Sequence, residues 1–484
     1  MAVPRARKGR SATIAAALSF VFPGAGQAYA RRWRAALAFG LPAVAGLVVL
    51  ATELNQGVSH LAARMFDPRV ALTVLLVIVV LGTWRVIAVV HAWRITERTP
   101  TAWLALPLLI AVIVGTHGFA FVSTAAMLDA GDRIASGGDG LLEPAVQVPG
   151  PTASDAGTPA EPTATPAATP PGTVGYNPLP EDDPYYEPED DPEPEIVEGS
   201  PPPFDVAAID TQTDGWLNVL IVGIDWKPGR DSSRTDTMIV VSTNTQTGDV
   251  YMFSFPRDIA QVPMYSGGTY SGKLNTFAGY AQRNPDTFPD GGMKSLGYQL
   301  GYLLGIPIDY YAAVDIPGFE KVVKAVGGVT VNNEKDIADY YMNNRKGFFL
   351  KAGEHRLDAQ QTLAYVRSRH GSSDFARARR QQQVLAALRK EMTRPEKLAN
   401  LPGVIDSVSE VLRTDFPRDR LADLISLSEQ VSDEPTASYV FRQPTWASFT
   451  PRSVTGHRSL TTLRVDKLRE LSIEIFGERS LYNR

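Results

Sequence analysis

The sequence predicts an α/β protein: a layered α/β/α outer domain with a central mixed sheet, preceded by an α-helical transmembrane region and a disordered stalk. Two observations predict this organisation. The 484 residues divide into an apolar N-terminal quarter, a Pro-rich acidic middle and a C-terminal half of ordinary composition. In that last half, short β-branched runs alternate with helical patterns. The expected segments are 1–34, 35–129, 130–204 and 205–484.

Charge, cysteine content and missing motifs exclude several classes of protein. The chain has 47 Lys and Arg against 52 Asp and Glu, so it is not a globally basic nucleic-acid binder. With no cysteine, it forms neither disulfides nor thiolate metal sites and has no thiol nucleophile. The sequence also contains no GxSxG, HExxH, GxxxxGK[ST] or dinucleotide-binding glycine pattern, which disfavours serine hydrolases, zincins, P-loop proteins and Rossmann enzymes.

Three apolar stretches, 35–52, 70–90 and 103–127, are each long enough to cross a bilayer as a helix, which takes roughly 20 residues. A shorter apolar stretch, 11–30, contains the sequence Pro-Gly-Ala-Gly at 23–26. Because Pro and Gly interrupt a helix, this stretch is predicted to form a re-entrant hairpin or an interfacial helix. A cleavable signal peptide is the weaker alternative. We expect segment 1–34 to be a cytoplasmic basic segment that contains this hairpin or interfacial helix.

Positive charge near the span ends predicts the orientation, because cytoplasmic segments collect Lys and Arg. The basic residues before the first span are Arg5, Arg7, Lys8, Arg10, Arg31, Arg32 and Arg34. With that end inside, everything after residue 127 lies outside, which predicts a multi-pass cell-membrane protein with an extracytoplasmic C-terminal domain. Arg85 and His117 fall within spans and could line a cavity. We expect instead that Arg85 extends toward the interface and that His117 faces a neighbouring helix.

The segment 130–204 is dominated by Pro, Thr, Ala, Gly and acidic residues. It cannot bury enough apolar surface to offset the entropy of ordering, so it is predicted to be a disordered or extended stalk. Fully extended, it would span up to about 200 Å at roughly 3 Å per residue.

The first part of the outer domain is predicted to form three β-strands. Runs 217–224, 237–242 and 250–255 are rich in β-branched and aromatic residues and are bounded by Gly, Asp and Pro, as strands are. Helices are predicted at 317–326, which begins with Pro and ends before two glycines, and at 375–392, capped by Ser373 or Asp374.

Polar residues at the ends of these strands are the first candidate site. Asp225 ends the first strand, and Arg234 and Asp236 precede the second. Arg257 and Asp258 follow the third. These groups should therefore gather along one rim of the sheet.

A second group of candidates follows along the chain. Arg367 and Arg369 are two residues apart and point the same way if that piece is extended. Arg377 and Gln381 are four apart and share a helix face near an N-terminus whose dipole favours anions.

Several guanidiniums with two or three carboxylates indicate a phosphate site with a hard divalent cation. The alternative is ordinary surface Arg–Asp pairs, and the run ARARRQQQ could be a solvated helix face or a nucleic-acid patch. The expected extracytoplasmic location argues against nucleic acid as a partner. Either Asp225 or Asp236 could ligate a metal while the other acts as base, and their spacing does not decide between them.

Taken together, the motifs in 217–427 resemble the LytR-CpsA-Psr family of bacterial cell-wall glycopolymer ligases. They are NVLIVGID, SRTDTMIVVS, FSFPRD, KLNTFAGY, DYYAAVDIPGFEKVVKAVGGVTV, AGEHRLDAQQTLAYVRSR and DFARARRQQQVL, in the family's order. Ala376 stands where the family usually has Gly, and three spans replace its usual single anchor.

The resemblance implies transfer of a phosphorylated glycan from a polyprenyl-pyrophosphate carrier to a hydroxyl of peptidoglycan at the membrane. It implies Asp225 and Asp236 as ligands of Mg²⁺ or Mn²⁺, and these acids with Arg257 as catalytic residues. The implied pyrophosphate-binding residues are Arg234, Arg257, Lys273, Arg367, Arg369, Arg377 and Gln381. An apolar groove for the isoprenoid would be lined by LGYQLGYLLGIPIDYY and GFEKVVKAV. Two alternatives stay open: a polyprenyl-pyrophosphate hydrolase using the same site, and a non-catalytic lipid-phosphate sensor.

Overall fold

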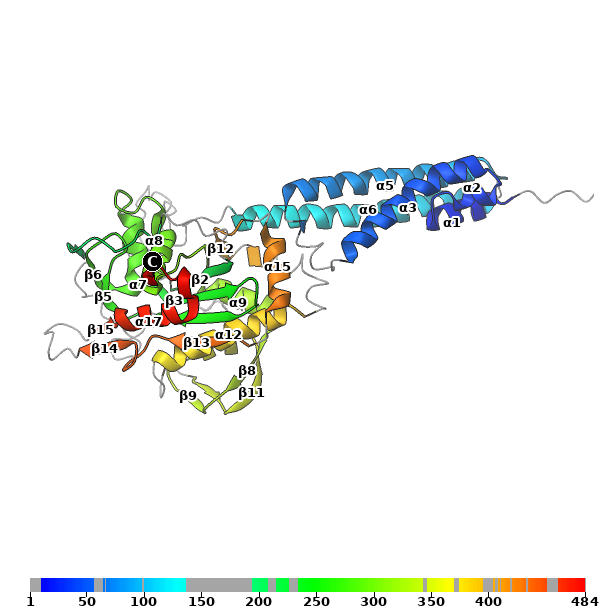
Figure 1. Cartoon of the computed structure of the whole chain (residues 1–484). Coiled ribbons are helices and arrows are strands. Elements are labelled where there is room, and N and C mark those ends of the chain that lie inside the picture. The colour runs from blue at the N-terminus through cyan, green and yellow to red at the C-terminus, as the bar shows by residue number, and fades with distance from the viewer. Residues whose placement is uncertain are drawn as a thin grey trace, which may run out of the picture.

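The computed structural model shows an N-terminal group of long helices and a C-terminal α/β domain (Figure 1). The residues it describes are 10–55, 64–65, 67–97, 100–135, 194–207, 215–225, 234–342, 346–369, 374–394, 404, 408–409, 411–417, 420–431, 434–450 and 460–483.

The three predicted spans are confirmed as helices long and apolar enough to cross a membrane: α3 (Trp33–Leu54), α5 (Pro68–Arg94) and α6 (Pro100–Ala135). At the start of α5, the Asp67 carboxylate accepts a hydrogen bond from the Arg69 amide at 2.8 Å, next to a proline in the first turn. Most apolar side chains of α3 are exposed, as expected for a helix surrounded by lipid.

The apolar stretch 11–30 forms two short helices, α1 (Ala12–Val21) and α2 (Ala25–Tyr29), rather than a span. They join at Gly24, whose φ of 101° favours glycine. Ala12 and Ala16 of α1 pack in one buried cluster with Val89 and Trp93 of α5. The two short helices therefore pack against the membrane helices, and their re-entrant or interfacial placement in the bilayer stays a prediction.

His117 faces a neighbouring helix, as expected, whereas Arg85, which was expected to extend toward the membrane interface, is hydrogen-bonded to the backbone of α1. Arg85 Nη2 donates to the Phe20 carbonyl of α1 at 2.5 Å. The ring of His117 faces Gly82 of α5, where an added Cβ would lie 3.0 Å from the imidazole.

The predicted stalk overlaps described structure at both ends. Helix α6 continues to Ala135, and β1 (Ile196–Val197) pairs antiparallel with β6 (Thr269–Lys273). Phe204 packs against Tyr302 and Tyr482 at ring-centroid distances of 5.4 and 5.2 Å. The rest of the predicted stalk, 136–193, lies outside the described residues.

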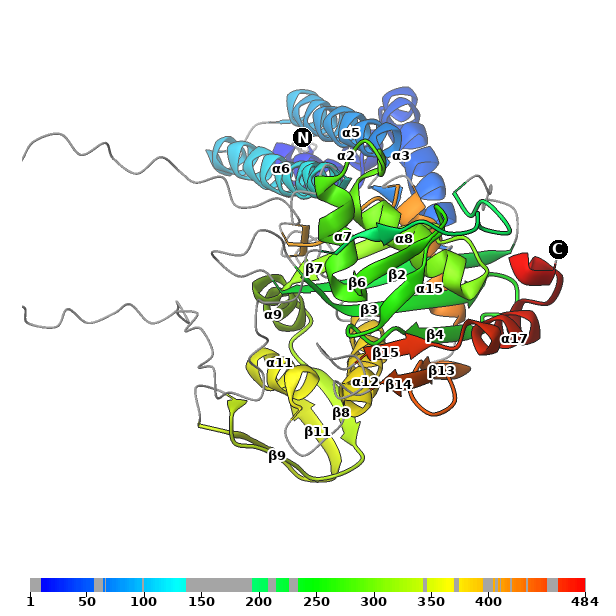
Figure 2. The same cartoon turned by 90° about the vertical axis from the view of Figure 1, so that its left-hand side faces the viewer.

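A six-stranded mixed sheet forms the centre of the outer domain, in the order β12-β7-β2-β3-β4-β13 (Figure 2). Its strands are β2 (Trp216–Asp225), β3 (Arg234–Asn244), β4 (Val250–Ser254), β7 (Tyr310–Asp315), β12 (Arg413–Thr414) and β13 (Ala437–Val440). β3 is antiparallel to both β2 and β4, whereas β7 runs parallel to β2 and β13 parallel to β4. The three strands predicted from the sequence are β2, β3 and β4.

Helices cover both faces of this sheet, which confirms the layered α/β/α prediction. On one face, buried Val222, Val240 and Phe253 belong to a core that includes residues of α7 (Leu274–Arg283), α8 (Gly291–Leu304) and α17 (Val465–Phe476). On the other face, Gln382 of α12 (Asp374–Met392) donates to the Ser254 hydroxyl at 2.9 Å. This contact fixes α12 over β4.

A second, smaller core lies beside α12. It gathers residues from α9 (Ile316–Ala325), β8 (Val329–Asn333), β9 (Ile337–Asp339), β10 (Phe348–Leu350), β11 (Gly353–Leu357) and α11 (Ala359–Arg367). The remaining elements include β5 (Ala260–Pro263), β14 (Ala447–Thr450), β15 (Leu460–Leu463) and α15 (Leu421–Gln430). The predicted helices 317–326 and 375–392 are α9 and α12.

Candidate functional site

One rim of the sheet carries the first group of predicted residues. The pairing directions put the ends of β2, β4 and β7 and the start of β3 at the same edge. Asp225 and Arg234 are direct cross-strand partners there. Arg257 follows the end of β4, so the predicted gathering of acidic and guanidinium groups is confirmed for these residues.

A bulge in β3 sets the position of Asp236. Thr237 pairs with Gly223 and Thr235 pairs with Ile224, so Asp236 is the extra residue between two regular pairs. Bulges of this kind redirect one side chain and are frequent beside functional sites. Gly223 permits the close approach, since a Cβ there would lie 3.0 Å from the Thr237 side chain.

Asp236 forms an ion pair with Arg257. Nη1 of Arg257 lies 3.1 Å from each carboxylate oxygen of Asp236. The Arg257 side chain is 8% exposed and the Asp236 side chain 28% exposed. Arg377, near the start of α12, is 7% exposed and also acts electrostatically on Asp236. A strand, a strand end and a helix therefore each supply one charged group to the same point.

These charges decide the protonation state of Asp236. Burial raises the pKa of its carboxyl, but the positive charges of Arg257 and Arg377, with the hydrogen bond from Arg257, lower it further than burial raises it. The net result is a pKa below the ordinary value of 3.8, so Asp236 is ionised at neutral pH. The three charged groups together carry one net positive charge, which suits an anionic ligand.

Asn275 belongs to this site, although the sequence analysis singled out only Lys273 in its motif. It is fully buried in the first turn of α7, and its amide lowers the pKa of Asp236. Its side-chain nitrogen and oxygen make no conventional hydrogen bond within the described part of the chain. Lys273, half-buried, lies at the N-cap of the same helix. The sequence gives no local signal that separates a buried Asn from an exposed one.

The predicted extended piece around Arg367 and Arg369 is wrong. Helix α11 continues through Arg367, which is exposed, and ends at Ser368. The backbone amide of Arg369 instead donates to the buried Asp339 carboxylate at 3.0 Å. The two arginines therefore do not lie on one face of a strand, and no described contact joins either to Asp236.

Arg377 and Gln381 lie one turn apart on α12, as predicted. Gln381 is half-buried and its Nε2 is 3.5 Å from the Val366 carbonyl. Of the two predicted caps, Asp374 begins the helix, and Ser373 lies outside the described residues. Arg380, which lies between Arg377 and Gln381 in the sequence, is buried. It donates from Nε to the Tyr365 carbonyl at 2.8 Å and from Nη2 to the Ser368 carbonyl. Arg380, which the sequence analysis missed, holds the end of α11 against α12.

Few acidic side chains in the described part of the rim are available as ligands for a metal ion. Within the described residues, no three His, Asp or Glu side chains come together as a metal cluster. Asp225 and Asp236 nevertheless lie on adjacent strands at one edge. Mg²⁺ is commonly held by one or two carboxylates with substrate phosphates and water completing its shell, so both acids are of the right ligand type, and the metal site stays a prediction.

The residues expected to line an apolar groove are mostly packed inside the domain. Leu296, Leu300 and Leu303 of α8 are fully buried in the larger core, and Val323 of α9 is fully buried in the smaller one. The groove therefore stays a prediction.

The family description "LytR_cpsA_psr family" matches residues 189–441. Regulatory protein MsrR of Staphylococcus aureus (strain Mu50) is 37% identical over 210 residues, which are 43% of this chain and 58% of MsrR. The chain thus matches little more than half the length of that relative. The polyisoprenyl-teichoic acid–peptidoglycan teichoic acid transferase TagU of Halalkalibacterium halodurans is 30% identical over 227 residues, 46% of this chain and 67% of TagU. The crystal structure of B. subtilis TagV aligns with a TM-score of 0.45 at 24% identity, covering 56% of this chain and 98% of that one.

Proposed function

This chain belongs to the LytR-CpsA-Psr family, and on that premise we propose that it is a membrane-anchored phosphotransferase of cell-wall assembly. It transfers a phosphorylated glycopolymer from a polyprenyl-pyrophosphate carrier to a hydroxyl of peptidoglycan, on the extracytoplasmic side of the membrane. The transferase activity for which TagU is named supports the reaction class. The observation that carries the proposal is the ionised Asp236 held between two buried guanidiniums at the sheet rim.

The guanidiniums provide the binding chemistry. Planar guanidinium groups match phosphate oxygens with paired N–H donors, and Arg257 and Arg377 are both almost fully buried. In such a site, fixed positive charge stabilises the transferring phosphoryl group and the leaving polyprenyl phosphate. The acceptor oxygen forms the new P–O bond, the bond to polyprenyl phosphate breaks, and the acceptor's proton passes to a base.

The lowered pKa of Asp236 favours different roles for the two acids. A carboxylate with a depressed pKa is a weak base, so Asp236 is better suited to hold a cation or orient Arg257. Asp225, at the end of β2, is then the candidate base. Mg²⁺ or Mn²⁺, held by Asp236 with or without Asp225, would add charge neutralisation at the phosphates.

A second candidate function is a sensor or regulator that binds a lipid pyrophosphate without turning it over. The name of MsrR as a regulatory protein, with 37% identity over 210 residues, favours it. A third candidate function is a polyprenyl-pyrophosphate hydrolase, in which water attacks the phosphorus at the same site.

One experiment separates the three functions. The full chain is incubated with a polyprenyl-pyrophosphate-linked saccharide, Mg²⁺ and peptidoglycan fragments, and mass spectrometry follows polyprenyl phosphate and the glycan–peptidoglycan product. Product that depends on the acceptor supports the transferase. Release of polyprenyl phosphate without an acceptor supports the hydrolase, and binding without either product supports the sensor.

Matched variants on α12 tie the activity to the site. Arg377→Ala should lower turnover at least about 100-fold, because loss of one fixed donor to a developing oxyanion typically costs that much. Arg379→Ala is the control, because Arg379 is exposed on the same helix and pairs with Glu334 at 3.5 Å. Equal activities for the two variants would remove Arg377 from the site.

A further inference from the structure

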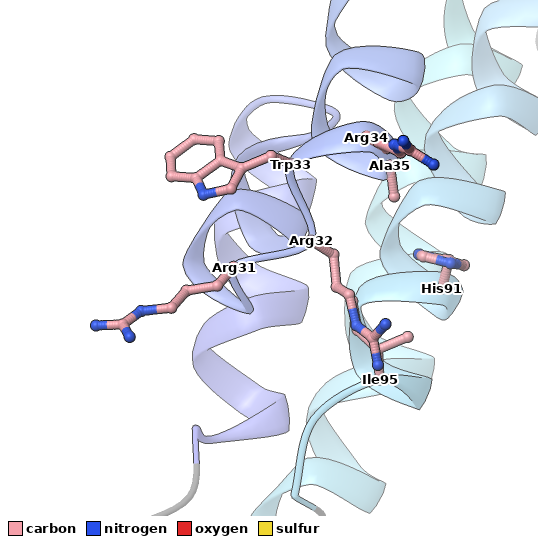
Figure 3. A pocket seen from close by; sticks show the side chains of 7 residues that line it. All are labelled: Arg31, Arg32, Trp33, Arg34, Ala35, His91 and Ile95. Atoms are coloured by element: carbon pink, nitrogen blue, oxygen red, sulfur yellow. The ribbon is translucent and has the colours of Figure 1, made fainter.

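A hollow lies at one end of the membrane helices, far in sequence from the rim of the sheet. It has a volume of about 600 Å³ and lies between the start of α3 and the end of α5 (Figure 3). Among the residues that the structure describes there, three arginines and a histidine contribute to the lining, and no carboxylate does. The full lining is Arg31, Arg32, Trp33, Arg34, Ala35, His91 and Ile95.

The turn that carries the arginines is tightly held. Arg31 has a φ of 58°, a left-handed conformation that costs energy in a residue other than glycine. Its amide donates to the Ala28 carbonyl at 2.8 Å, and the Arg32 amide donates to the Gln27 carbonyl at 2.9 Å. At Gly24, an added Cβ would lie 2.4 Å from the Ala36 carbonyl oxygen, so α2 and α3 are in close contact.

Buried polar contacts orient His91 on the opposite wall. The Ser19 hydroxyl donates to Oε1 of the fully buried Gln27 at 2.8 Å, which leaves the Gln27 Nε2 as a donor. That nitrogen lies 2.8 Å from the Ala88 carbonyl and 3.5 Å from His91 Nδ1. With Nδ1 accepting, a neutral His91 carries its proton on Nε2 and can donate from that atom.

We propose that this hollow binds the phosphate group of an anionic membrane lipid. Arg32 and Arg34 extend toward the helix that carries His91, which brings cationic and donor groups together (Figure 3). The hollow lies where two helices long and apolar enough to cross a membrane begin and end, so a bilayer that they span would place it at the level of the lipid headgroups. Trp33, 65% exposed, suits the interfacial region, and Ala35 and Ile95 supply apolar contact for the start of an acyl chain.

This proposal goes beyond the usual excess of positive charge at one membrane face. The general excess of positive charge requires only that basic residues lie near the ends of the spans. Here Arg31, Arg32 and Arg34 line one hollow together with His91. The apolar wall and the exposed Trp33 favour a lipid over a soluble anion. The proposal does not depend on the proposed transferase activity.

The test measures lipid retained by the full chain in a neutral detergent. Phosphatidylglycerol or phosphatidylcholine is added, and bound lipid is quantified by native mass spectrometry. The doubly substituted variant, Arg32→Gln with Arg34→Gln, should bind phosphatidylglycerol at least tenfold more weakly than the unmodified chain. Arg94→Gln is the control, because Arg94 is exposed in the last turn of α5 and does not line the hollow. Its affinity should change less than twofold.

Three results would overturn the proposal. They are equal binding by the double variant and the unmodified chain, an equal loss in Arg94→Gln, and displacement of phosphatidylglycerol by an equal concentration of inorganic phosphate. The last would identify the ligand as a soluble anion. If the double variant does not fold, as judged by thermal unfolding, Arg34→Gln alone should weaken binding at least threefold, and an unchanged affinity would then refute the site.

Discussion

Replacing Asp236 with Asn removes the carboxylate that both hydrogen-bonds and neutralises Arg257 at the rim, while keeping the size of the side chain. In the folded chain, both Asp236 oxygens lie 3.1 Å from Arg257 Nη1. The variant leaves two guanidiniums, each 7% exposed, without that carboxylate. Stability should therefore fall, because buried cations that lose a counter-charge are costly.

The structure limits the size of the effect. A hydrogen bond to a charged group contributes about 1.5–3 kcal/mol, and the partial exposure of Asp236 keeps the expected loss near the middle of that range, at about 2 kcal/mol. For a domain of this size, 1 kcal/mol corresponds to a shift of about 2–4 °C in Tm, so a decrease of roughly 4–8 °C is expected. Asp258→Asn is the matched control: the Asp258 carboxylate is 3.9 Å from Arg257 Nε and 36% exposed, so it should cost under about 1 kcal/mol.

Thermal unfolding of the full chain, with and without pyrophosphate, measures both the loss and its cause. Without metal, pyrophosphate should raise the Tm of Asp236→Asn more than that of the unmodified chain, because the ligand supplies the missing negative charge and meets no carboxylate. Adding Mg²⁺ should strengthen pyrophosphate binding only in the unmodified chain. Equal Tm values for Asp236→Asn and Asp258→Asn would refute the argument that the rim is organised around Asp236.

Two further predictions concern other parts of the chain. Burial raises the pKa of Tyr365 to about 12, so above pH 10 the folded chain keeps a proton that the unfolded chain loses. The contribution of Tyr365 to stability should consequently fall between pH 10 and 12 by up to about 3 kcal/mol, and Tyr365→Phe should remove that part of the decrease in urea unfolding measured at several pH values. Gly26→Ala should lower the Tm in detergent by several degrees, since the added Cβ would lie 1.9 Å from the Ala15 carbonyl oxygen. Gly46→Ala, with nothing within 4 Å, should leave the Tm unchanged or raise it, and equal shifts in both variants would contradict the packing of α1 on α2.

The membrane helices and the central strands could be predicted because their signals are local. An apolar run of the right length predicts a span, and a β-branched run bounded by turn residues predicts a strand. The rim followed from the same strands, since Asp225 and Arg234 stand at strand ends and Arg257 follows the end of β4 by three residues. The bulge at Asp236 did not follow, because it depends on how β3 pairs with β2 and not on either strand alone.

The interpretation of Arg367 and Arg369 failed for a different physical reason. Asp358 and Gln361 form a capping box that starts α11, but nothing nearby in the sequence marks its end. The end is held by Arg380, which comes from another helix and donates to the Tyr365 and Ser368 carbonyls. A helix end fixed by a tertiary contact cannot be recognised from the local pattern, and Asn275 was missed because its burial depends on the packing of α7.

The placement of one acid among arginines explains how the rim can be stable by itself and still bind anions. Two like charges about 4 Å apart near a protein surface repel by roughly 4 kcal/mol, so closely spaced guanidiniums alone would strain the fold. Asp236 offsets this repulsion and orients Arg257, while one net positive charge is left for a ligand. A bound pyrophosphate would replace part of that function, and the carboxylate would then be free to share a cation with it. The acid therefore serves the free site as a counter-charge and the occupied site as a ligand, which is why removing it should have opposite effects on stability and on metal-free anion binding.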